Sequence, residues 1–508
     1  MPAAPGPASP ACLSKSRCKP ARSAGKIPTL PLKLLHYNEG MMTRRRLLEI
    51  FGAGVLAGRA RAAPPPTALA HRALGRTGRW VTPFGLGGQA AFQFPTSEAE
   101  SVDIIVRAIE LGINYLDTAN AYGPSQSLYG RAFWKLRITP GHPDYDAALR
   151  ERLFIASKTA QRYAYDRSRP QAATAISDLR RTLTQMFGDG QGWIPDGAYL
   201  DLFQIHNLTT EQQVDQIYEA LELRGGQMPD RIGALAGLLD YRDGTNFTGL
   251  NPEYRRFIRH IGISGHQSPL VLMKAIQRDD LNILDTLLVA LNANDRHYFS
   301  HQYNVIPVAL AKGTGIIAMK VFCAGGMYTG MQRQPREASE LIRTVGVPGG
   351  VDSADLIRYP LSVPGVAVVI AGVSRVDRER PENDQLACNL AAAVMDVPTE
   401  AERRRIESAV AERHGARTNY FQDASRGLVH PQAPKIEHDG DRVWVRWTTG
   451  LAGSEPIRSY KIYSAADLRA WIPFRPQTAT APLSLPLPSY MVGDDPVRVE
   501  ASTELPPW

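Results

Sequence analysis

From Arg72 onward, short apolar runs alternate with longer segments whose apolar residues recur at helical spacing. This alternation is typical of parallel strands joined by crossover helices. The runs lie near residues 84–87, 115–116, 153–156, 202–205, 261–263, 287–291, 316–319 and 366–371. Eight consecutive strand–helix units predict an α/β fold, a (β/α)8 TIM barrel with insertions, over residues 72–415.

The helices between these runs have recognisable ends. Ser97 and Glu100 have the spacing of a capping box, and Gly112 is placed to end the helix that they begin. Residues 171–186 and 210–223 show similar apolar spacing, and a last helix is expected at Glu400–His414. In such barrels the reacting groups lie at the carboxyl ends of the strands, so polar residues at those ends are the candidates for chemistry.

Four such groups follow three neighbouring strands. Asp117 ends the second predicted strand, Lys158 the third and His206 the fourth, while Tyr122 lies on the loop after the second. Each has an ordinary alternative interpretation: Asp117 as a cap of the next helix, Lys158 as a surface cation, His206 as a hydrogen-bonded core residue, and Tyr122 as a packing aromatic. Because the carboxyl ends of these strands share one rim, the four together predict a single site for proton chemistry.

A phenol donates a proton to a carbonyl oxygen readily only if its anion is stabilised. A neighbouring ammonium would lower the pKa of Tyr122, and Lys158 can be that ammonium, with Asp117 holding it charged and in place. His206 would hydrogen-bond the substrate oxygen and orient it. This set suits carbonyl reduction with hydride delivered by a bound cofactor.

Residues 71–400 or so resemble an aldo-keto reductase. The resemblance rests on LGRTG (74–78), GLG (85–87), GINYLDTANAYG (112–123), FIASK (154–158) and LDLFQIHN (200–207). These motifs stand in the family's order and spacing. The resemblance implies that Tyr122 is the general acid/base, that Asp117 and Lys158 tune it, and that His206 orients the carbonyl.

The resemblance also implies a nicotinamide cofactor, NADP with NAD as the alternative. It assigns Ser374 to the phosphates and Asn383 to the adenine, and three arginines nearby could bind a 2′-phosphate by bidentate hydrogen bonds. Glu379 stands where the family has an arginine. The residues implied at this end of the cofactor are Gly372, Ser374, Arg375, Glu382 and Asn383.

The nicotinamide end departs from the family pattern. Ser264 is followed by glycine and histidine where the family usually has asparagine, and Leu288 replaces an expected glutamine. Met319 or Lys320 stands where a stacking tyrosine is expected. Asn292 and a second asparagine two residues later could compensate. We therefore assign Ser264, Asn292 and Lys320 to this end of the cofactor.

Two insertions enlarge the predicted barrel. Residues 139–150 lengthen the connection after the second helix, and residues 223–258 enlarge the fourth unit. Loops over a barrel rim commonly shape substrate access. The alternative is a surface excursion without a function.

The sequence predicts that residues 1–63 form a leader. An early segment rich in Pro, Ala, Ser and Lys precedes Arg44-Arg45-Arg46, an apolar run from Ile50 to Gly58, and the small-x-small sequence Ala60-Arg61-Ala62. This arrangement resembles a twin-arginine export signal. The apolar run is shorter than the ~20 residues of a membrane span, so no stable membrane anchor is expected. The leader predicts a periplasmic or secreted protein that uses the twin-arginine export machinery, and residues 64–71 form a linker.

The spacing of apolar residues along the sequence changes after the predicted barrel. Beyond a linker at 416–432, apolar residues alternate with polar ones, and Asp439-Gly440 is a hairpin signal. Residues 433–508 predict a small all-β sandwich-like domain, similar to a fibronectin type III-like module. We expect a docking role for it, with carbohydrate binding as a lesser alternative.

Composition narrows the function classes. The net charge of +8 is spread along the chain and the four cysteines are scattered, so neither nucleic-acid binding nor a metal site is predicted. The sequence predicts an exported NAD(P)-dependent oxidoreductase that interconverts a carbonyl and an alcohol on an aldehyde, ketone or sugar, and it predicts no oligomeric state. The alternatives are a non-catalytic binding or scaffold protein on a degenerate barrel, and a sugar lyase or isomerase on the same rim.

Overall fold

A computed structural model describes residues 69–89, 91–160, 171–223, 231–295, 300–302, 304–331, 333–346 and 351–414, together with six strands between residues 432 and 502. The chain divides into two units, Met1–Gly58 and Arg59–Trp508. The first unit lies wholly outside the described residues. The predicted leader (1–63) and nearly all of the predicted linkers (64–71 and 416–432) lie outside them as well.

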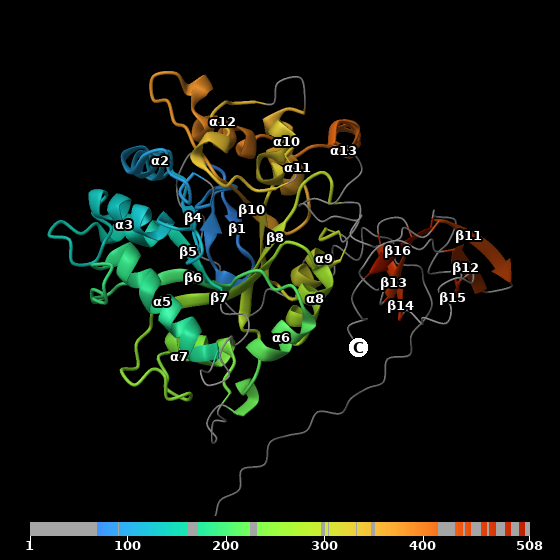
Figure 1. Cartoon of the computed structure of the whole chain (residues 1–508), viewed down its shortest axis with the longest axis horizontal. Helices are drawn as coiled ribbons and strands as arrows, with labels where there is room; N and C mark the ends of the chain where they lie inside the picture. The colour runs from blue at the N-terminus through green and yellow to red at the C-terminus, as the bar shows by residue number, and fades with distance from the viewer. Residues whose placement is uncertain are drawn as a thin grey trace, which may run out of the picture. The chain divides into compact units, whose positions relative to one another are not determined.

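Eight parallel strands close into a barrel in the order β10-β3-β4-β5-β6-β7-β8-β9 (Figure 1). They are β3 (Phe84–Gly87), β4 (Tyr115–Asp117), β5 (Phe154–Thr159), β6 (Leu200–Ile205), β7 (Ile258–Gly265), β8 (Leu284–Ala290), β9 (Gly315–Met319) and β10 (Val366–Ala371). Each strand overlaps one of the eight predicted apolar runs. The predicted (β/α)8 barrel is therefore confirmed.

The helices are α2 (Glu98–Glu110), α3 (Ser125–Lys135), α4 (Ala147–Arg152), α5 (Gln171–Phe187), α6 (Glu211–Ile217), α7 (Ala234–Asp243), α8 (Pro269–Gln277), α9 (Val305–Ala311), α10 (Gly326–Thr329), α11 (Ser353–Leu361), α12 (Gln385–Val394) and α13 (Glu400–His414). Ser97 caps α2 as predicted, because its side chain accepts a hydrogen bond from the backbone N–H of Glu100. The helix expected over 210–223 ends earlier, at Ile217. Ala220 has a φ of 64°, in the left-handed region, and this interrupts the helix before a short 3-10 turn.

The strands bury apolar side chains on both faces. One cluster lies between the strands and the helices, and a second lies inside the barrel. A short hairpin of β1 (Arg72–Ala73) and β2 (Trp80–Val81) contributes to the inner cluster through Leu74 and Val81, both fully buried. The inside of the barrel is thus a packed core, and polar chemistry is confined to its two ends.

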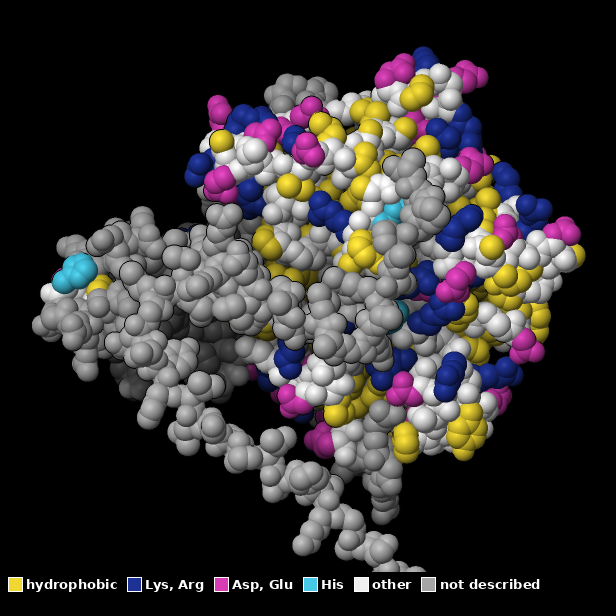
Figure 2. Space-filling view, turned by 180° about the vertical axis from the view of Figure 1, so that it is seen from behind, with side chains coloured by type: hydrophobic (Ala, Val, Ile, Leu, Met, Phe, Trp, Pro, Cys, Tyr) yellow, Lys and Arg dark blue, Asp and Glu magenta, His cyan; other side chains and the backbone are white. Residues whose placement is uncertain are grey.

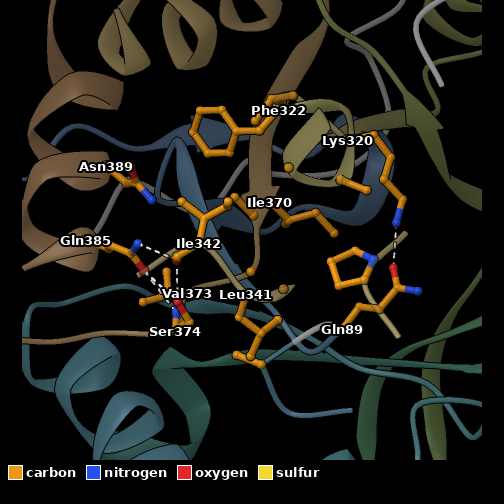
Figure 3. A pocket seen from close by; sticks show the side chains of 18 of the residues that line it. Gln89, Lys320, Phe322, Leu341, Ile342, Ile370, Val373, Ser374, Gln385 and Asn389 are labelled. Carbon is orange, nitrogen blue, oxygen red and sulfur yellow. Dashed lines mark hydrogen bonds between the residues drawn. The ribbon is translucent and has the colours of Figure 1, made fainter. Parts of the chain in front are cut away.

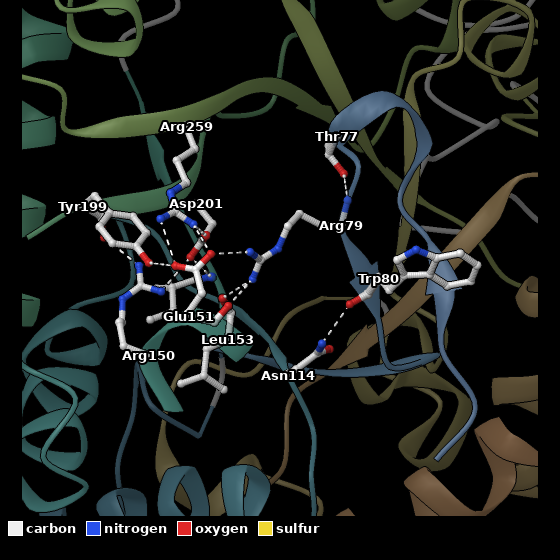
Figure 4. A network of polar contacts seen from close by, with 11 residues as sticks. Thr77, Arg79, Trp80, Asn114, Arg150, Glu151, Leu153, Tyr199, Asp201 and Arg259 are labelled. Carbon is white, nitrogen blue, oxygen red and sulfur yellow. Dashed lines mark hydrogen bonds and ion pairs between the residues drawn. The ribbon is translucent and has the colours of Figure 1, made fainter. Parts of the chain in front are cut away.

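A polar network joins the amino-terminal ends of β5 and β6 (Figure 4). The guanidinium of Arg150 donates to Asp201 Oδ2 over 2.9 Å and to the carbonyl of Tyr199 over 2.9 Å. The same carboxylate oxygen accepts the backbone N–H of Ile155 over 3.0 Å. Arg150 and Asp201 are almost fully shielded from solvent, so each charge depends on the other for compensation.

Glu151 extends this network toward the surface. It accepts hydrogen bonds from Arg79, Tyr199 and Arg259 over 3.0–3.1 Å. Hydrogen bonds from Arg259 lower the pKa of Glu151 to about 2. The hairpin, α4 and β7 are therefore tied together by one carboxylate.

Parts of both predicted insertions lie at this same end of the barrel. Residues 139–150 lead into β5, and the loop 244–257 within the second predicted insertion leads into β7. A chain enters each parallel strand at the end opposite to the carboxyl ends. Residues 139–150 and 244–257 therefore lie away from the catalytic rim, whereas residues 224–230 of the second insertion lie outside the described residues.

The carboxyl-terminal residues form two antiparallel sheets of three strands each. One has the order β11 (Gln432–Asp439), β12 (Arg442–Thr448), β15 (Leu483–Pro488), and the other β14 (Asp467–Pro473), β13 (Ser459–Ser464), β16 (Val497–Ser502). Asp439 pairs with Arg442 where the hairpin turn is predicted. The prediction that an all-β segment follows the barrel is confirmed.

On the face of the molecule seen in Figure 2, basic and acidic side chains of the barrel are interspersed. In the part of the chain that the structure describes, no helix combines the length and apolarity needed to cross a membrane.

Replacing Arg150 by Met tests the role of the buried ion pair. The variant leaves Asp201 charged inside the protein with a weakened set of partners, so we expect the free energy of unfolding to fall by about 3–5 kcal/mol. The control is Arg131→Met, because Arg131 and its partner Glu98 are more than half exposed, and its change should stay within about 0.5 kcal/mol. Urea unfolding followed by circular dichroism measures both, and equal small losses would contradict this account.

Candidate active site

The four predicted catalytic residues meet at the carboxyl ends of β4, β5 and β6. The Lys158 ammonium contacts Asp117 Oδ1 and donates to the carbonyl of Thr118 over 2.9 Å. Both members of this ion pair are buried, at 1% and 2% exposure. The phenolic oxygen of Tyr122 lies 3.5 Å from His206 Nε2, and Lys158 Nζ lies 5.1 Å from the centre of the Tyr122 ring.

Hydrogen bonds between small polar groups hold the loop that carries Tyr122. The hydroxyls of Thr118 and Ser125 are 2.8 Å apart, and Ser125 donates to the carbonyl of Gly88 over 2.8 Å. Gly88 has no room for a side chain, because a Cβ there would lie 2.5 Å from the carbonyl oxygen of Asp117. The first and second strand ends are thereby pressed together beside Tyr122.

Burial and ion pairing oppose each other at the Lys158–Asp117 pair. Burial raises the pKa of Asp117 and lowers the pKa of Lys158, while the attraction between the two charges works against both shifts. The amide of Gln204 adds a contact of 3.5 Å to the second oxygen of Asp117. The carboxylate is the group that keeps Lys158 charged in a buried position.

A cavity opens from Tyr122 and Asp117 along the carboxyl end of β10 (Figure 3). Gly372 and Ser374 line it, as predicted, and Gln385 and Asn389 of α12 lie at its far end. The cavity therefore joins a proton-transfer group at one end to hydrogen-bonding side chains at the other.

Lys320 lies in the same cavity, directly after β9. Its φ of 61° is in the left-handed region, which is costly for a lysine. The ammonium donates to the side-chain oxygen of Gln89, whose amide in turn donates to Gln334 over 2.7 Å. Burial, and after it the charge of Lys158, lowers the pKa of Lys320 to about 8.

The segment 341–346 lies against the Ser374 end of the cavity. The Ser374 hydroxyl donates to the carbonyl of Ile342, and the Gln385 amide donates to the carbonyls of Ile342 and Thr344 over 2.8 and 2.9 Å. Gln385 also accepts the backbone N–H of Ser374 over 2.9 Å. These side chains are thus held in place by backbone groups from the β9–α11 connection.

His206 has a second histidine behind it. The His266 ring lies 6.2 Å from the His206 ring, and His266 Nδ1 is 2.7 Å from the side-chain oxygen of Asn207. Burial, followed by the charge of Lys320, places the pKa of His266 well below its usual value. A neutral imidazole at the carboxyl end of β7 therefore lies next to His206.

Several predicted cofactor residues do not line this cavity. Ser264 accepts the backbone N–H of Asn207 over 2.9 Å, and Asn292 donates to the carbonyl of Lys320 over 3.0 Å. Arg375 contacts Asp377 over 3.4 Å. The remaining two, Glu382 and Asn383, lie on the 3-10 turn η5 (Pro381–Asn383) outside the cavity walls. Of the predicted cofactor set, the structure brings Lys320, Gly372 and Ser374 together with Tyr122.

Sequence reasoning missed Gln89, Gln385 and Asn389. Gln89 could have been found, since it lies two residues beyond the first barrel strand, on the rim where Asp117 ends the second. Gln385 and Asn389 lie on a helix and give no comparable signal. In the described residues no group of three or more His, Cys, Asp or Glu side chains is arranged to hold a metal ion.

The lining fits a nicotinamide dinucleotide. Gly87 and Gly372 approach so closely that a Cβ on Gly87 would lie 3.3 Å from the Gly372 nitrogen, which leaves bare backbone along the wall. Lys320 and Ser374 supply a cation and a hydroxyl for anionic and polar groups of a cofactor.

Residues 83–224 match the model of the Aldo/keto reductase family. Among curated proteins, the chain is 29% identical over 161 residues to YqkF, an uncharacterised oxidoreductase of Bacillus subtilis, and 28% identical over 225 residues to D-arabinose 1-dehydrogenase of Saccharomyces cerevisiae. These matches cover 30% and 42% of this chain and 44% and 53% of the relatives, so the chain spans about half the length of the curated relatives it matches.

A solved aldo/keto reductase of Klebsiella pneumoniae, in complex with NADP and acetate, is 16% identical, with a TM-score of 0.41 over 66% of this chain and 94% of the other. The residues that match the Aldo/keto reductase model, 83–224, include Asp117, Tyr122, Lys158 and His206.

Proposed function

We propose that this protein is an NAD(P)-dependent oxidoreductase that interconverts a carbonyl and an alcohol, with NADP(H) as its cofactor. The observation that carries the proposal is the position of Tyr122 at one end of a cavity, with its hydroxyl beside His206 and its ring centre 5.1 Å from a buried ammonium. The substrate class is an aldehyde, ketone or sugar. The similarity to a D-arabinose 1-dehydrogenase supports a sugar or a small aldehyde.

In the reductive direction, Tyr122 donates its phenolic proton to the substrate oxygen as that oxygen gains negative charge. His206 Nε2, 3.5 Å from the phenol, hydrogen-bonds the same oxygen and orients the carbonyl. The Lys158 charge favours the phenolate that remains, and Asp117 keeps Lys158 charged despite its burial. When bound, the cofactor supplies the hydride.

Lys320 and Ser374 would hold the cofactor, and Gly372 would let it approach the backbone. We prefer NADP(H) because Arg375, which follows Ser374 directly in the sequence but contacts Asp377 outside the cavity wall, carries a guanidinium suited to a 2′-phosphate. Arg378 contributes less to this choice, since it binds Asp103 and Glu110 of α2.

We further propose that the protein is exported to the periplasm or secreted by the twin-arginine route. The support is the leader sequence, with Arg44-Arg45-Arg46 before a short apolar run. Because this route carries folded proteins and free NADPH is not expected outside the cytoplasm, the cofactor would travel bound to the enzyme. Paired oxidation and reduction of substrates would then recycle it.

The two carboxyl-terminal sheets support a third part of the proposal. We propose that residues 433–508 form a fibronectin type III-like module that docks on the barrel or between subunits. Two antiparallel sheets of three strands, joined by short hairpins, suit such a module.

Tyr122→Phe tests the catalytic role of the phenol. Without the proton donor, turnover of a general aldehyde with NADPH should fall by about 10²–10⁴-fold, while the dissociation constant for NADPH stays the same. The control is Tyr129→Phe, a buried tyrosine whose hydroxyl binds the carbonyl of Leu86 outside the cavity. Steady-state kinetics and fluorescence titration separate the two effects, and unchanged turnover in Tyr122→Phe would favour the non-catalytic binding protein.

The pKa of Lys320 predicts how cofactor binding depends on pH. Its ammonium is present below about pH 8 and is lost above it. We therefore expect the affinity for NADPH to fall between pH 7 and pH 9, and Lys320→Met to weaken binding about tenfold at pH 7 with no such fall. Lys135→Met, on the exposed end of α3, should behave like the unchanged protein. Parallel pH dependences in all three proteins would exclude this role for Lys320.

Retention of the cofactor is tested with the exported protein itself. The mature chain is purified from the periplasm without added nucleotide and treated with a reductant. Its absorbance is then measured at about 340 nm, where reduced nicotinamide absorbs. We expect bound nucleotide in nearly stoichiometric amount. Protein without nucleotide would refute tight cofactor retention, and protein confined to the cytoplasm would refute export.

A further inference from the structure

A second cavity lies at the opposite end of the barrel, where β6 and β7 begin. Its walls come from α5, from the connection 188–199 before β6 and from the connection 244–257 before β7. The charged residues that line it are five arginines and two carboxylates: Arg180, Arg242, Arg255, Arg256, Arg259, Asp196 and Glu253. This is the region to which the second insertion contributes, and the proposed reaction makes no use of it.

The loop 244–257 is built around two buried polar side chains. Asp240 accepts hydrogen bonds from the backbone N–H groups of Phe247 and Thr248 over 3.0 and 2.9 Å, and from two hydroxyls. The amide of Asn251, 1% exposed, donates to the carbonyls of Asp240, Thr245 and Arg255 over 2.9–3.1 Å. The arginines on this loop are therefore displayed from a fixed backbone.

The other wall is also an ordered turn. The side chain of Asp189 accepts the backbone N–H groups of Gln191, Gly192 and Trp193 over 2.8–3.0 Å. Trp193 lines the cavity and is 57% exposed. Hydrogen bonds to Asp189 fix the backbone of Trp193, and its exposed indole offers a flat surface against which another ring can pack.

The carboxylates in the wall do not neutralise all of the arginines. Asp196 and Glu253 both bind the same residue, Arg255, over 2.9 and 3.0 Å. Two more arginines have carboxylate partners outside the lining, since Arg242 pairs with Asp243 and Arg259 with Glu151.

The remaining two are Arg180 and Arg256. Arg180 hydrogen-bonds Tyr241, and its guanidinium lies 5.9 Å from the centre of the Phe257 ring. Among the described residues neither of these two arginines forms an ion pair with a carboxylate, so the cavity carries excess positive charge. Guanidinium groups bind phosphate oxygens bidentately and with charge assistance.

We propose that this cavity binds a small phosphate ester that carries a planar ring. Arg180 and Arg256 bind the phosphate, and Trp193 packs against the ring. The ligand lies at the end of the barrel opposite to Tyr122. It is therefore a second ligand, distinct from the substrate and the cofactor of the proposed reaction.

Isothermal titration calorimetry of the full chain at low ionic strength tests this site, with phenyl phosphate and inorganic phosphate as probes. Phenyl phosphate should bind saturably with one site per chain and more tightly than inorganic phosphate. Arg256→Ser removes a side chain that makes no ion pair in the described structure, and it should weaken phenyl phosphate binding by about tenfold. Trp193→Ala should abolish the advantage of phenyl phosphate over inorganic phosphate.

Two controls separate this site from other sources of phosphate binding. Arg404→Ser removes an exposed arginine of α13 that lies outside the cavity, and its affinity should stay within twofold. Ser374→Ala alters the first cavity and should also leave the affinity unchanged. The proposal is overturned by an absence of saturable binding, by equal losses in the Arg256 and Arg404 variants, or by a loss confined to the Ser374 variant.

Discussion

The candidate site depends on the ion pair between Lys158 and Asp117. Removing two charges from water is costly, and their attraction offsets that cost only when the geometry is close and further hydrogen bonds satisfy the remaining polar atoms. Here the ammonium also binds the Thr118 carbonyl and the carboxylate contacts Gln204. The pair therefore places a stable positive charge beside a phenol. Without Asp117, burial would favour the neutral amine, and the phenolate of Tyr122 would lose its stabilising charge.

The two ends of the barrel carry different kinds of polar structure. At the carboxyl ends of the strands, the parallel arrangement brings Asp117, Tyr122 and Lys320 to one cavity. At the amino-terminal ends, Arg150 and Asp201 are buried against each other, and Glu151 accepts hydrogen bonds from Arg79, Tyr199 and Arg259. The connections 139–150 and 244–257 lie at this second end, away from the proton-transfer groups, and the second of them lines a cavity of its own.

The barrel and the meeting of the four candidate catalytic residues could be predicted because their signals are local. A buried parallel strand is a short apolar run, and the residue at its carboxyl end must point to the shared rim, so Asp117, Lys158 and His206 followed from strand positions alone. The cofactor residues were harder to predict. Arg375 lies outside the cavity wall although it follows Ser374, and Gln385 gave no signal because a helical position does not reveal which cavity its side chain reaches.

The sequence by itself determined the fold class, the strand order around the rim and the set of residues that meet there, because periodicity and strand ends are properties of neighbouring residues. Only the tertiary structure decided which end of the barrel the long loops occupy and how the charges are distributed within them. The pairing of Asp196 and Glu253 with one arginine, which leaves Arg256 without a carboxylate in the described structure, depends on distances between segments far apart in the chain. Such distances are set by packing, and composition or spacing does not encode them.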